Sequence, residues 1–242
     1  MLDTDFYLDG ISAKTKGIYS GKPVSFSPAV PKISSVQIPG KSGNLQIDEG
    51  GYYNRTATVP CFTLTTTSTA MADMKTAAAW LLSLRGYRKL QTKEDTTHYW
   101  YASIKNTAEI APRLNLLNPF TIEWDCKPYA YLTGYDSKIT IAASGDTVNN
   151  PTYFDAYPIL YITGTANGQI AFPTGDITLV DDVQAEIAID CEAQRAYDPL
   201  TGSSKDYLIS ATEFPYFHGG TNAVTFSGIT SLKYIPRFRE IL

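Results

Sequence analysis

Residues able to carry out catalysis are sparse in this chain of 242 residues. The only histidines are His98 and His218, so a Ser-His-Asp triad or a histidine metal site would depend on one of these two side chains. His98 stands beside the aromatic run 99–101, which favours a strand face, and His218 precedes Gly219-Gly220, which favours a turn. Both histidines therefore have a structural explanation.

Carboxylates offer two further candidate pairs, Glu123 with Asp125 and Asp181 with Asp182. A pair can divide general acid and general base roles only where the surroundings separate the two pKa values. The first pair falls on the solvated face of an expected strand, and the second falls in an expected turn. We therefore expect no catalytic residue.

Two loop motifs for ligands are also incomplete. Gly40-Lys41-Ser42 resembles the end of a phosphate-binding loop, but Ser35 stands where that loop requires glycine, and a strand is expected to follow it instead of a helix. Asp3, Asp5 and Asp9 do not have the spacing of a calcium-binding loop. We expect neither a metal site nor a bound cofactor.

Three cysteines, Cys61, Cys126 and Cys191, stand alone in strand-like surroundings. An odd and sparse count argues against a disulfide framework, and the spacing excludes a Cys-x-x-Cys metal knuckle. We interpret all three as small buried hydrophobic residues.

Composition indicates a globular chain that does not enter a membrane. Charged residues make up 18% of the sequence, below the roughly 25% of an average soluble domain, and hydrophobic residues make up 43%. No stretch approaches the roughly 18 apolar residues of a membrane-spanning helix, and residues 1–5 lack the layout of a signal peptide. We expect no membrane partner and no cleaved leader.

Charge is distributed unevenly along the chain. Residues 1–132 hold 14 Lys and Arg against 11 Asp and Glu, whereas residues 133–242 hold 6 against 13. The difference agrees with two units that have different neighbours, and equally with ordinary surface variation. No basic cluster is present, so we expect no specific binding of nucleic acid.

Apolar and polar residues alternate along most of the chain, and Gly, Pro, Asn and Asp interrupt the pattern about every ten residues. In the stretch 120–126 the alternation places Phe120, Ile122, Trp124 and Cys126 on one face. Similar patterns predict strands at 24–26, 56–64, 98–104 and 159–162. The expected fold class is mainly β, with two β-sandwich domains.

One segment, at about residues 70–85, has the spacing of an amphipathic helix behind a Ser68/Thr69 start and before Gly86. Its apolar residues recur at spacings of three and four, at Met74, Ala77, Ala78, Leu81 and Leu84. We expect this stripe, with Trp80 and Leu82, to be buried against a sheet, because so short a helix has little stability alone.

The composition changes after the segment 128–134, where the positive part of the chain gives way to the negative part. We therefore predict an N-terminal domain at 1–132, a β-sandwich with the helix, and a C-terminal β-sandwich at 133–242. The last strand, 232–242, either completes the second sandwich or returns to the first domain.

Several motifs resemble, in order and over nearly the whole chain, those of the distal tail (Dit) proteins of siphophages that infect Gram-positive bacteria. The N-terminal motifs are residues 5–11, Ile38-Pro39-Gly40-Lys41-Ser42-Gly43, Arg55 at the head of a strand, and residues 119–129. The C-terminal motifs are Ile189-Asp190-Cys191-Glu192, Phe214-Pro215, Gly220-Thr221-Asn222 and Pro236-Arg237. Each is weak alone, and their order makes the resemblance specific.

This resemblance implies a structural protein of the phage tail tip and no enzyme. It implies an N-terminal domain that assembles into a homo-hexameric ring and a C-terminal galectin-like sandwich outside the ring. Such a hub joins the major tail protein of the tail tube to the tail-associated lysin or tail fibre, and contacts receptor-binding or baseplate proteins at its periphery. The protein would then belong to a virion, phage-encoded or prophage-encoded, that is assembled in the host cytoplasm.

Candidate motif and interface positions follow from the same resemblance: Phe6, Tyr7, Gly10, Pro39, Gly40, Gly43, Arg55, Pro215, Gly220 and Asn222. From the residues alone, the polar, glycine-bearing stretches 14–27 and 41–54, around expected short strands, are candidates for ring contacts or else loops without a partner. The alternative function is a carbohydrate-binding β-sandwich module for host cell-wall glycans. A monomer with an aromatic cleft would favour that alternative, and a stable hexamer would favour the hub.

Overall fold

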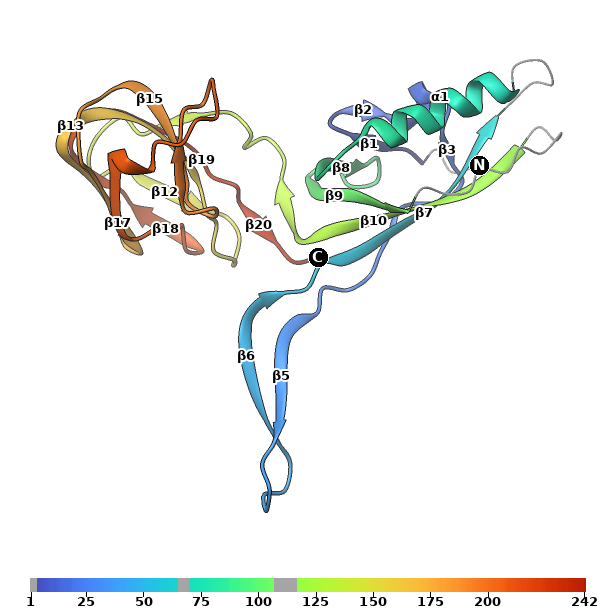
Figure 1. The fold of residues 1–242 in the computed structure, drawn as a ribbon, viewed down its shortest axis with the longest axis horizontal. Coiled ribbons are helices and arrows are strands. Elements are labelled where there is room, and N and C mark those ends of the chain that lie inside the picture. The colour runs from blue at the N-terminus through green and yellow to red at the C-terminus, as the bar shows by residue number, and fades with distance from the viewer. Residues whose placement is uncertain (1–3, 65–69, 107–116) are drawn as a thin grey trace. The chain divides into compact units, whose positions relative to one another are not determined.

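The computed structural model describes residues 4–64, 70–106 and 117–242 (Figure 1). Strands dominate, and α1 (Ala70–Ser83) is the one α-helix within these residues. The chain divides into two compact units, Met1–Ala130 with Ile241–Leu242 (unit 1) and Tyr131–Glu240 (unit 2). The expected fold class, mainly β with a helix near residues 70–85, is confirmed. That the chain forms two separate domains with a boundary after residue 132 stays a prediction.

A nine-stranded sheet holds most strands of unit 1. Its order is β2-β1-β8-β9-β10-β7-β3, while β4 also pairs with β7 and β20 (Arg239–Glu240) pairs with β10. The other strands of the sheet are β1 (Phe6–Leu8), β2 (Ile11–Ser12), β3 (Tyr19–Ser20), β4 (Ser25–Phe26), β7 (Arg55–Leu64), β8 (Arg88–Thr92), β9 (His98–Asn106) and β10 (Leu117–Leu132). A short 3-10 helix, η1 (Ala13–Lys16), follows β2.

The strand β10 shows why this sheet forms where it does. Phe120, Ile122, Trp124 and Cys126 are all buried in one hydrophobic core, as their alternation predicts. The Trp124 side chain is 0% exposed, and its ring meets that of Phe6 from β1 edge to face, with 5.2 Å between the ring centroids. The core therefore joins the first strand of the chain to a strand more than a hundred residues later.

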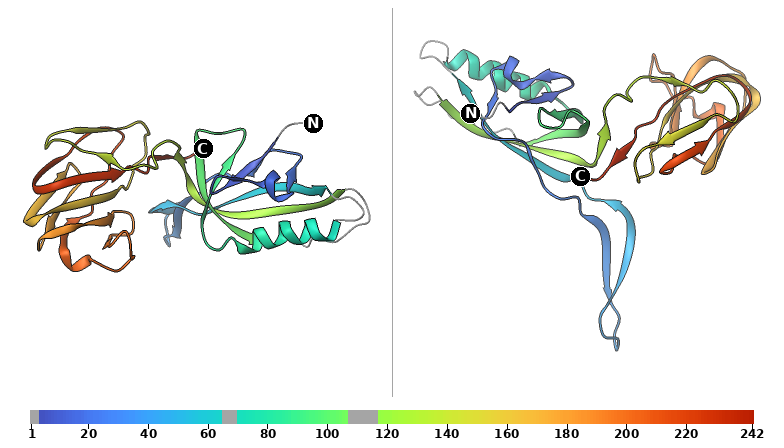
Figure 2. Two further views of the ribbon diagram at one scale, coloured as in Figure 1. Left: turned by 90° about the horizontal axis from the view of Figure 1, so that it is seen from above. Right: turned by 180° about the vertical axis from the view of Figure 1, so that it is seen from behind.

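Helix α1 lies along this sheet, as Figures 1 and 2 show. Ala77 and Leu81 are buried in the same core, and Trp80 and Leu84 pack against it. Leu82 was expected to be buried but is 59% exposed. The prediction was wrong because Leu82 is rotated by about 100° from Leu81 around the helix axis, away from the buried stripe. The expected start at Ser68/Thr69 and the side chain of Met74 lie outside the described residues.

A long hairpin interrupts the strands of unit 1. Its strands, β5 (Pro31–Gln37) and β6 (Asn44–Tyr52), form a two-stranded sheet and pair with no other strand in the described part of the chain (Figure 1). Gly50 and Gly51 have φ angles of 76° and 78°, and the register shifts between Pro31 and Ile33. Such consecutive left-handed residues favour glycine and form a bulge at the base of the hairpin.

Unit 2 contains a seven-stranded sheet, a two-stranded sheet and a separate hydrophobic core. The larger sheet has the order β11-β19-β13-β14-β17, with β15 also on β13 and β16 on β15; β12 pairs with β18. The strands are β11 (Ile139–Thr140), β12 (Thr147–Asn150), β13 (Ile159–Phe172), β14 (Gly175–Leu179), β15 (Val183–Asp190), β16 (Arg195–Tyr197), β17 (Ile209–Glu213), β18 (Gly220–Ala223) and β19 (Thr225–Ile235), with a 3-10 helix η2 (Asp206–Leu208).

Candidate assembly surface

The β5–β6 hairpin has one aliphatic face and one mainly polar face. Residues directly opposite each other in the ladder share a face, and successive residues alternate between faces. Val36 pairs with Leu45 and Ser34 with Ile47, so these four side chains lie on one side. Ser35 with Gln46, Gln37 with Asn44, and Ile33 with Asp48 lie on the other side. Val36, Leu45 and Ile47 are called the aliphatic face below.

Nothing in the described chain covers the aliphatic face. Val36, Leu45 and Ile47 are 45%, 46% and 47% exposed, whereas Leu8, Ile18 and Val59 in the core of unit 1 are at most 2% exposed. A two-stranded hairpin without a core is at best marginally stable in water. Aliphatic residues gathered on one exposed side of such a hairpin are typical of an interaction surface.

Three of the predicted positions, Pro39, Gly40 and Gly43, lie in the turn at the tip of this hairpin and are exposed. Gly40 and Gly43 have φ angles of 80° and 83°, so the turn needs glycine at both positions. The Lys41 amide donates a hydrogen bond to the Ile38 carbonyl at 3.2 Å and closes the turn. These residues shape the tip and leave the aliphatic face to the strands behind it.

The other N-terminal positions lie in the sheet of unit 1. Phe6 is buried against Trp124, Tyr7 is partly exposed on β1, and Gly10, with a φ of 80°, makes the turn into β2. Arg55 is buried at the start of β7. Its Nη1 donates to the carbonyl oxygen of Leu242 at 2.8 Å, and its guanidinium lies over the Phe26 ring. Burial lowers the pKa of Arg55 from its ordinary value.

The C-terminal positions lie together in unit 2, before and within β18. Pro215 is buried, and Gly220 has a φ of 89°. The buried Asn222 side chain accepts a hydrogen bond from the His218 amide at 3.0 Å and donates to the His218 and Gly220 carbonyls at 2.8 and 2.9 Å. These contacts give Pro215, Gly220 and Asn222 roles in the fold. As interface positions, all ten predicted residues stay predictions.

Each of the two histidines contacts a carboxylate through its Nδ1 atom. Nδ1 of His98 lies 2.8 Å from Asp95 Oδ2 and 2.9 Å from Thr97 Oγ1, within the turn that precedes β9. Nδ1 of His218 lies 2.8 Å from Asp155 Oδ1, and both side chains are largely exposed. In the described ranges, no group of three or more His, Cys, Asp or Glu residues could hold a metal ion.

Three carboxylates of the two candidate pairs accept hydrogen bonds from nearby backbone and side-chain groups. Asp125 Oδ2 accepts hydrogen bonds from Asn54 at 2.7 Å and from Tyr87 at 2.8 Å. Asp182 Oδ1 accepts a hydrogen bond from the Ala166 amide at 2.8 Å, and Asp181 Oδ1 accepts one from the Asp182 amide.

The three cysteines are buried and free, as expected, and burial raises the pKa of Cys61 and Cys126 to about 12.

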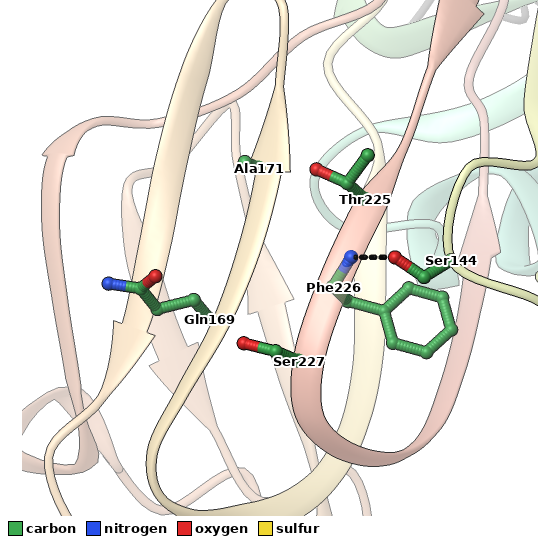
Figure 3. A pocket seen from close by; sticks show the side chains of 6 residues that line it. All are labelled: Ser144, Gln169, Ala171, Thr225, Phe226 and Ser227. Atoms are coloured by element: carbon green, nitrogen blue, oxygen red, sulfur yellow. Dashed lines mark hydrogen bonds between the residues drawn. The ribbon is translucent and has the colours of Figure 1, made fainter.

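An open depression of about 180 Å³ lies between β13 and β19 (Figure 3). Its lining has no titratable side chain and consists of Ser144, Gln169, Ala171, Thr225, Phe226 and Ser227. Figure 3 shows the Ser144 hydroxyl engaged with the Phe226 amide, a hydrogen bond of 2.8 Å. Its lining holds no acid, no base and no nucleophile that a neighbouring group activates, so this depression offers no hydrolytic chemistry.

Over the described residues, no helix has the length and apolarity needed to cross a membrane.

Two of the sequence motifs meet in unit 2. Asp190 and Glu192, at the end of β15 and just beyond it, face Arg237 and Arg239, which follow β19. Arg239 Nη1 lies 3.2 Å from Glu192 Oε1, and its Nε donates to the Asp155 carbonyl at 2.7 Å. Burial opposes ionisation of Asp190, but hydrogen bonds from Arg237 and its charge outweigh burial and hold the pKa of that carboxyl below its ordinary value.

Comparison with known proteins gives a match at the level of structure. The Dit protein (gp 19.1) of phage SPP1, described as a paradigm of the hub adsorption apparatus in phages infecting Gram-positive bacteria, aligns with a TM-score of 0.70 and 13% identity over 96% of this chain and 97% of its own. This chain has the fold of a phage Dit protein.

The same Dit fold aligns with chains of the phage P2 baseplate. The baseplate in its activated conformation with Ca gives a TM-score of 0.55 at 10% identity, covering 96% of both chains. The form with Sr gives 0.50 at 10% identity, covering 99% and 98%. No family model and no curated protein sequence matches the chain. The resemblance inferred from the motifs is thus confirmed for the fold.

The aliphatic face was not predicted from the sequence. The stretch 41–54 was described as polar around short strands, but β6 alone runs from Asn44 to Tyr52, and its partner β5 lies outside that stretch. The available signal was the alternation of Leu45 and Ile47 with polar residues, which is typical of a strand with one apolar side.

Proposed function

We propose that this protein is a structural component of a phage tail tip, a hub that assembles from several copies of the chain into a six-fold ring. The observation that carries the proposal is the correspondence, over 96% of the chain, with the Dit protein of phage SPP1, which is described as a hub. At 13% identity this likeness is one of fold. The proposal therefore needs a surface that fits assembly.

The β5–β6 hairpin supplies such a surface. A ring needs heterologous contacts, in which one patch of a protomer meets a different patch of the next and the rotation closes. The side chains of the aliphatic face are nearly half exposed in the single chain, so covering them in an assembly would remove apolar surface from water and stabilise the assembly. The hairpin also leaves sheet edges unpaired, which is hazardous in a monomer and useful in a ring.

As a hub, the ring would join the major tail protein of the tail tube to the tail-associated lysin or tail fibre. Unit 2, a galectin-like sandwich in this proposal, would contact receptor-binding or baseplate proteins at the periphery. The protein would act in the virion after assembly in the host cytoplasm, and it would catalyse no reaction.

Size-exclusion chromatography with light scattering tests the proposal on the full chain. The expected result is a particle with the mass of six protomers at micromolar concentration, without added ligand. A glycan array run on the same preparation separates the alternative function. A stable monomer that binds cell-wall glycans would overturn the hub and favour a carbohydrate-binding module.

A further inference from the structure

Unit 2 contains a groove of about 340 Å³ beside the N-terminal part of β15. One wall is the strand itself, from Val183 to Ile187. The opposite wall includes Lys205, Tyr207 and Leu208, which lie in and next to η2. A hollow of this size is within the range of ligand sites, and here one of its walls is a strand of the main sheet.

The outer edge of β15 is open along this groove. On its inner side β15 pairs with β13, and on its outer side β16 pairs with it only from Ala188 to Asp190. No other described strand pairs with β15, so residues 183–187 have no neighbouring strand on the outer side. An unpaired edge presents backbone N–H and C=O groups to which another extended chain can bind.

The outer wall of the groove is held in place by the chain itself. Residues 198–208 join β16 to β17 without pairing with the open edge. An isolated bridge between Tyr197 and Ser204 ties one end of this segment to β16, and the Val180 amide donates to the Leu208 carbonyl at 2.9 Å at the other end. The groove is therefore preformed, and its five strand residues span about 16 Å.

A bulge interrupts the inner pairing at the same place. Ile162 of β13 pairs with Ile187 and Gly164 pairs with Val183, so two steps along β13 face four steps along β15. The extra residues of a bulge have no regular partner in the ladder. Ala185, in the middle of this stretch, is exposed, whereas Val183 and Ile187 are each 3% exposed. Its small side chain leaves room in the groove.

The lining of the groove is negatively charged. Of its four carboxylates, Glu186 is neutralised by ion pairs with two lysines that do not line the groove. The other three belong to Asp181, Asp182 and Asp198, against a single cation, Lys205. This excess favours a cationic occupant and disfavours another copy of the acidic unit 2.

Tyr207 adds an aromatic surface to the groove. Its side chain stands on the wall opposite the strand edge and is 69% exposed. An exposed tyrosine ring offers a rigid apolar face and can make a cation–π contact with a lysine or arginine. The groove thus combines a free strand edge, a negative charge and an aromatic ring.

We propose that this groove binds an extended segment of a partner protein that carries lysine or arginine, and that the segment adds as a short strand to the outer edge of β15. Backbone hydrogen bonds to residues 183–187 hold the segment, and its cationic side chains lie near Asp181, Asp182 and the Tyr207 ring. The inference rests on the proposed role of unit 2 as a contact for peripheral proteins. It adds the site and the chemistry of the contact.

Hydrogen exchange on the full-length protein tests the strand addition. The probe is a hexapeptide of alternating lysine and valine with blocked ends. At saturating peptide, exchange of the amides within residues 184–187 should slow by about tenfold or more, because strand pairing protects amides. A hexapeptide of alternating glutamate and valine is the control and should give no protection. Binding of the lysine peptide without protection of these amides would overturn the strand addition.

Three variants locate the site. Asp181→Lys should weaken peptide binding by about tenfold, since it reverses a charge in the lining. Glu213→Lys, exposed on β17 and outside the groove, is the matched control and should bind as the wild type does. Ala185→Trp should abolish binding because it fills the groove, and it should fold normally because Ala185 is exposed. Equal binding by all three would place the peptide elsewhere and overturn the site.

The outcome for the groove is separable from that for the ring. A wild-type hexamer that binds no lysine peptide at about 1 mM would overturn the groove as a docking site and leave the hub intact. A wild-type monomer in which the peptide protects residues 184–187 would keep the docking site and overturn the ring.

Discussion

Arg237 and Asp190 form a two-pronged ion pair, with Nη1 2.9 Å from Oδ1 and Nη2 2.8 Å from Oδ2. The two side chains are 17% and 16% exposed. The pair joins the segment that follows β19 to the end of β15, two stretches that flank β13 on either side, because Ile159 of β13 pairs with both Asp190 and Ile235. The ion pair therefore links the segment after β19 to the end of β15 across the strand β13 that lies between them.

Removal of this arginine should destabilise unit 2. We expect Arg237→Ala to lower the free energy of unfolding by about 3 kcal/mol, because Asp190 would keep its charge in a partly buried place without its partner. Urea unfolding followed by fluorescence measures the change. The control is Arg195→Ala, whose exposed guanidinium lies over the Tyr197 ring and which should cost less than about 1 kcal/mol. Equal effects of the two substitutions would contradict this role.

Acid should weaken the same pair. Since the pKa of Asp190 is lower in the folded chain than in the unfolded one, the unfolded state binds the proton more tightly. The stabilisation is therefore present above the unfolded pKa, about 3.9, and is lost as the pH falls through the folded pKa. Stability measured from pH 6 down should fall less steeply in Arg237→Ala than in the wild type. If stability fell equally steeply with pH in both proteins, the ion pair with Arg237 would not be the cause of the lowered pKa of Asp190.

Trp124 should be the largest single contributor to the core of unit 1. Trp124→Ala removes a side chain that is 0% exposed and its edge-to-face contact with Phe6, and should cost about 3–5 kcal/mol. Thr121→Ala, on the exposed face of the same strand, is the control and should change stability by less than about 0.5 kcal/mol. Thermal unfolding of both variants measures the difference, and a mild effect of Trp124→Ala would contradict the packing described.

The cysteines should be unreactive in the folded protein. Burial raises the pKa of the Cys61 and Cys126 thiols to about 12 and raises that of Cys191 further, so almost no thiolate is present at pH 8. Ellman's reagent should label the native chain slowly and the denatured chain at all three positions within minutes. Rapid labelling of the native protein at pH 8 would show that the thiols are accessible.

The sequence could predict what depends on short-range periodicity. The alternation of Phe120, Ile122, Trp124 and Cys126 gave their common buried face correctly, and the spacing of Ala77 and Leu81 gave the buried side of the helix. Both patterns are set by the geometry of a single element. The burial of Leu82 was predicted wrongly because its apolar side chain was grouped with the stripe although it lies about 100° from Leu81 around the helix axis.

Relationships between distant segments could not be predicted in this way. Asp190 and Arg237 were both recognised as parts of motifs, yet their ion pair follows from the order of three strands. The aliphatic face likewise depends on the register that sets Val36 opposite Leu45. A shift of one residue on either strand would move its apolar side chains to the other face.

The hairpin should be needed for assembly and dispensable for the fold of unit 1. Leu45→Glu with Ile47→Glu places two charges on the aliphatic face, so self-association should be lost, while the urea midpoint of the monomeric unit should stay within error because neither side chain belongs to the core. Gln46→Glu, on the polar face, is the matched control and should assemble normally. Loss of folding in the double variant would contradict the separation of the two roles.

Electron microscopy of the purified full-length chain would show the proposed ring itself. We expect six-lobed rings in the wild type and none in the Leu45→Glu/Ile47→Glu variant. Single protomers in the wild-type images, at concentrations where the chain is folded, would contradict it.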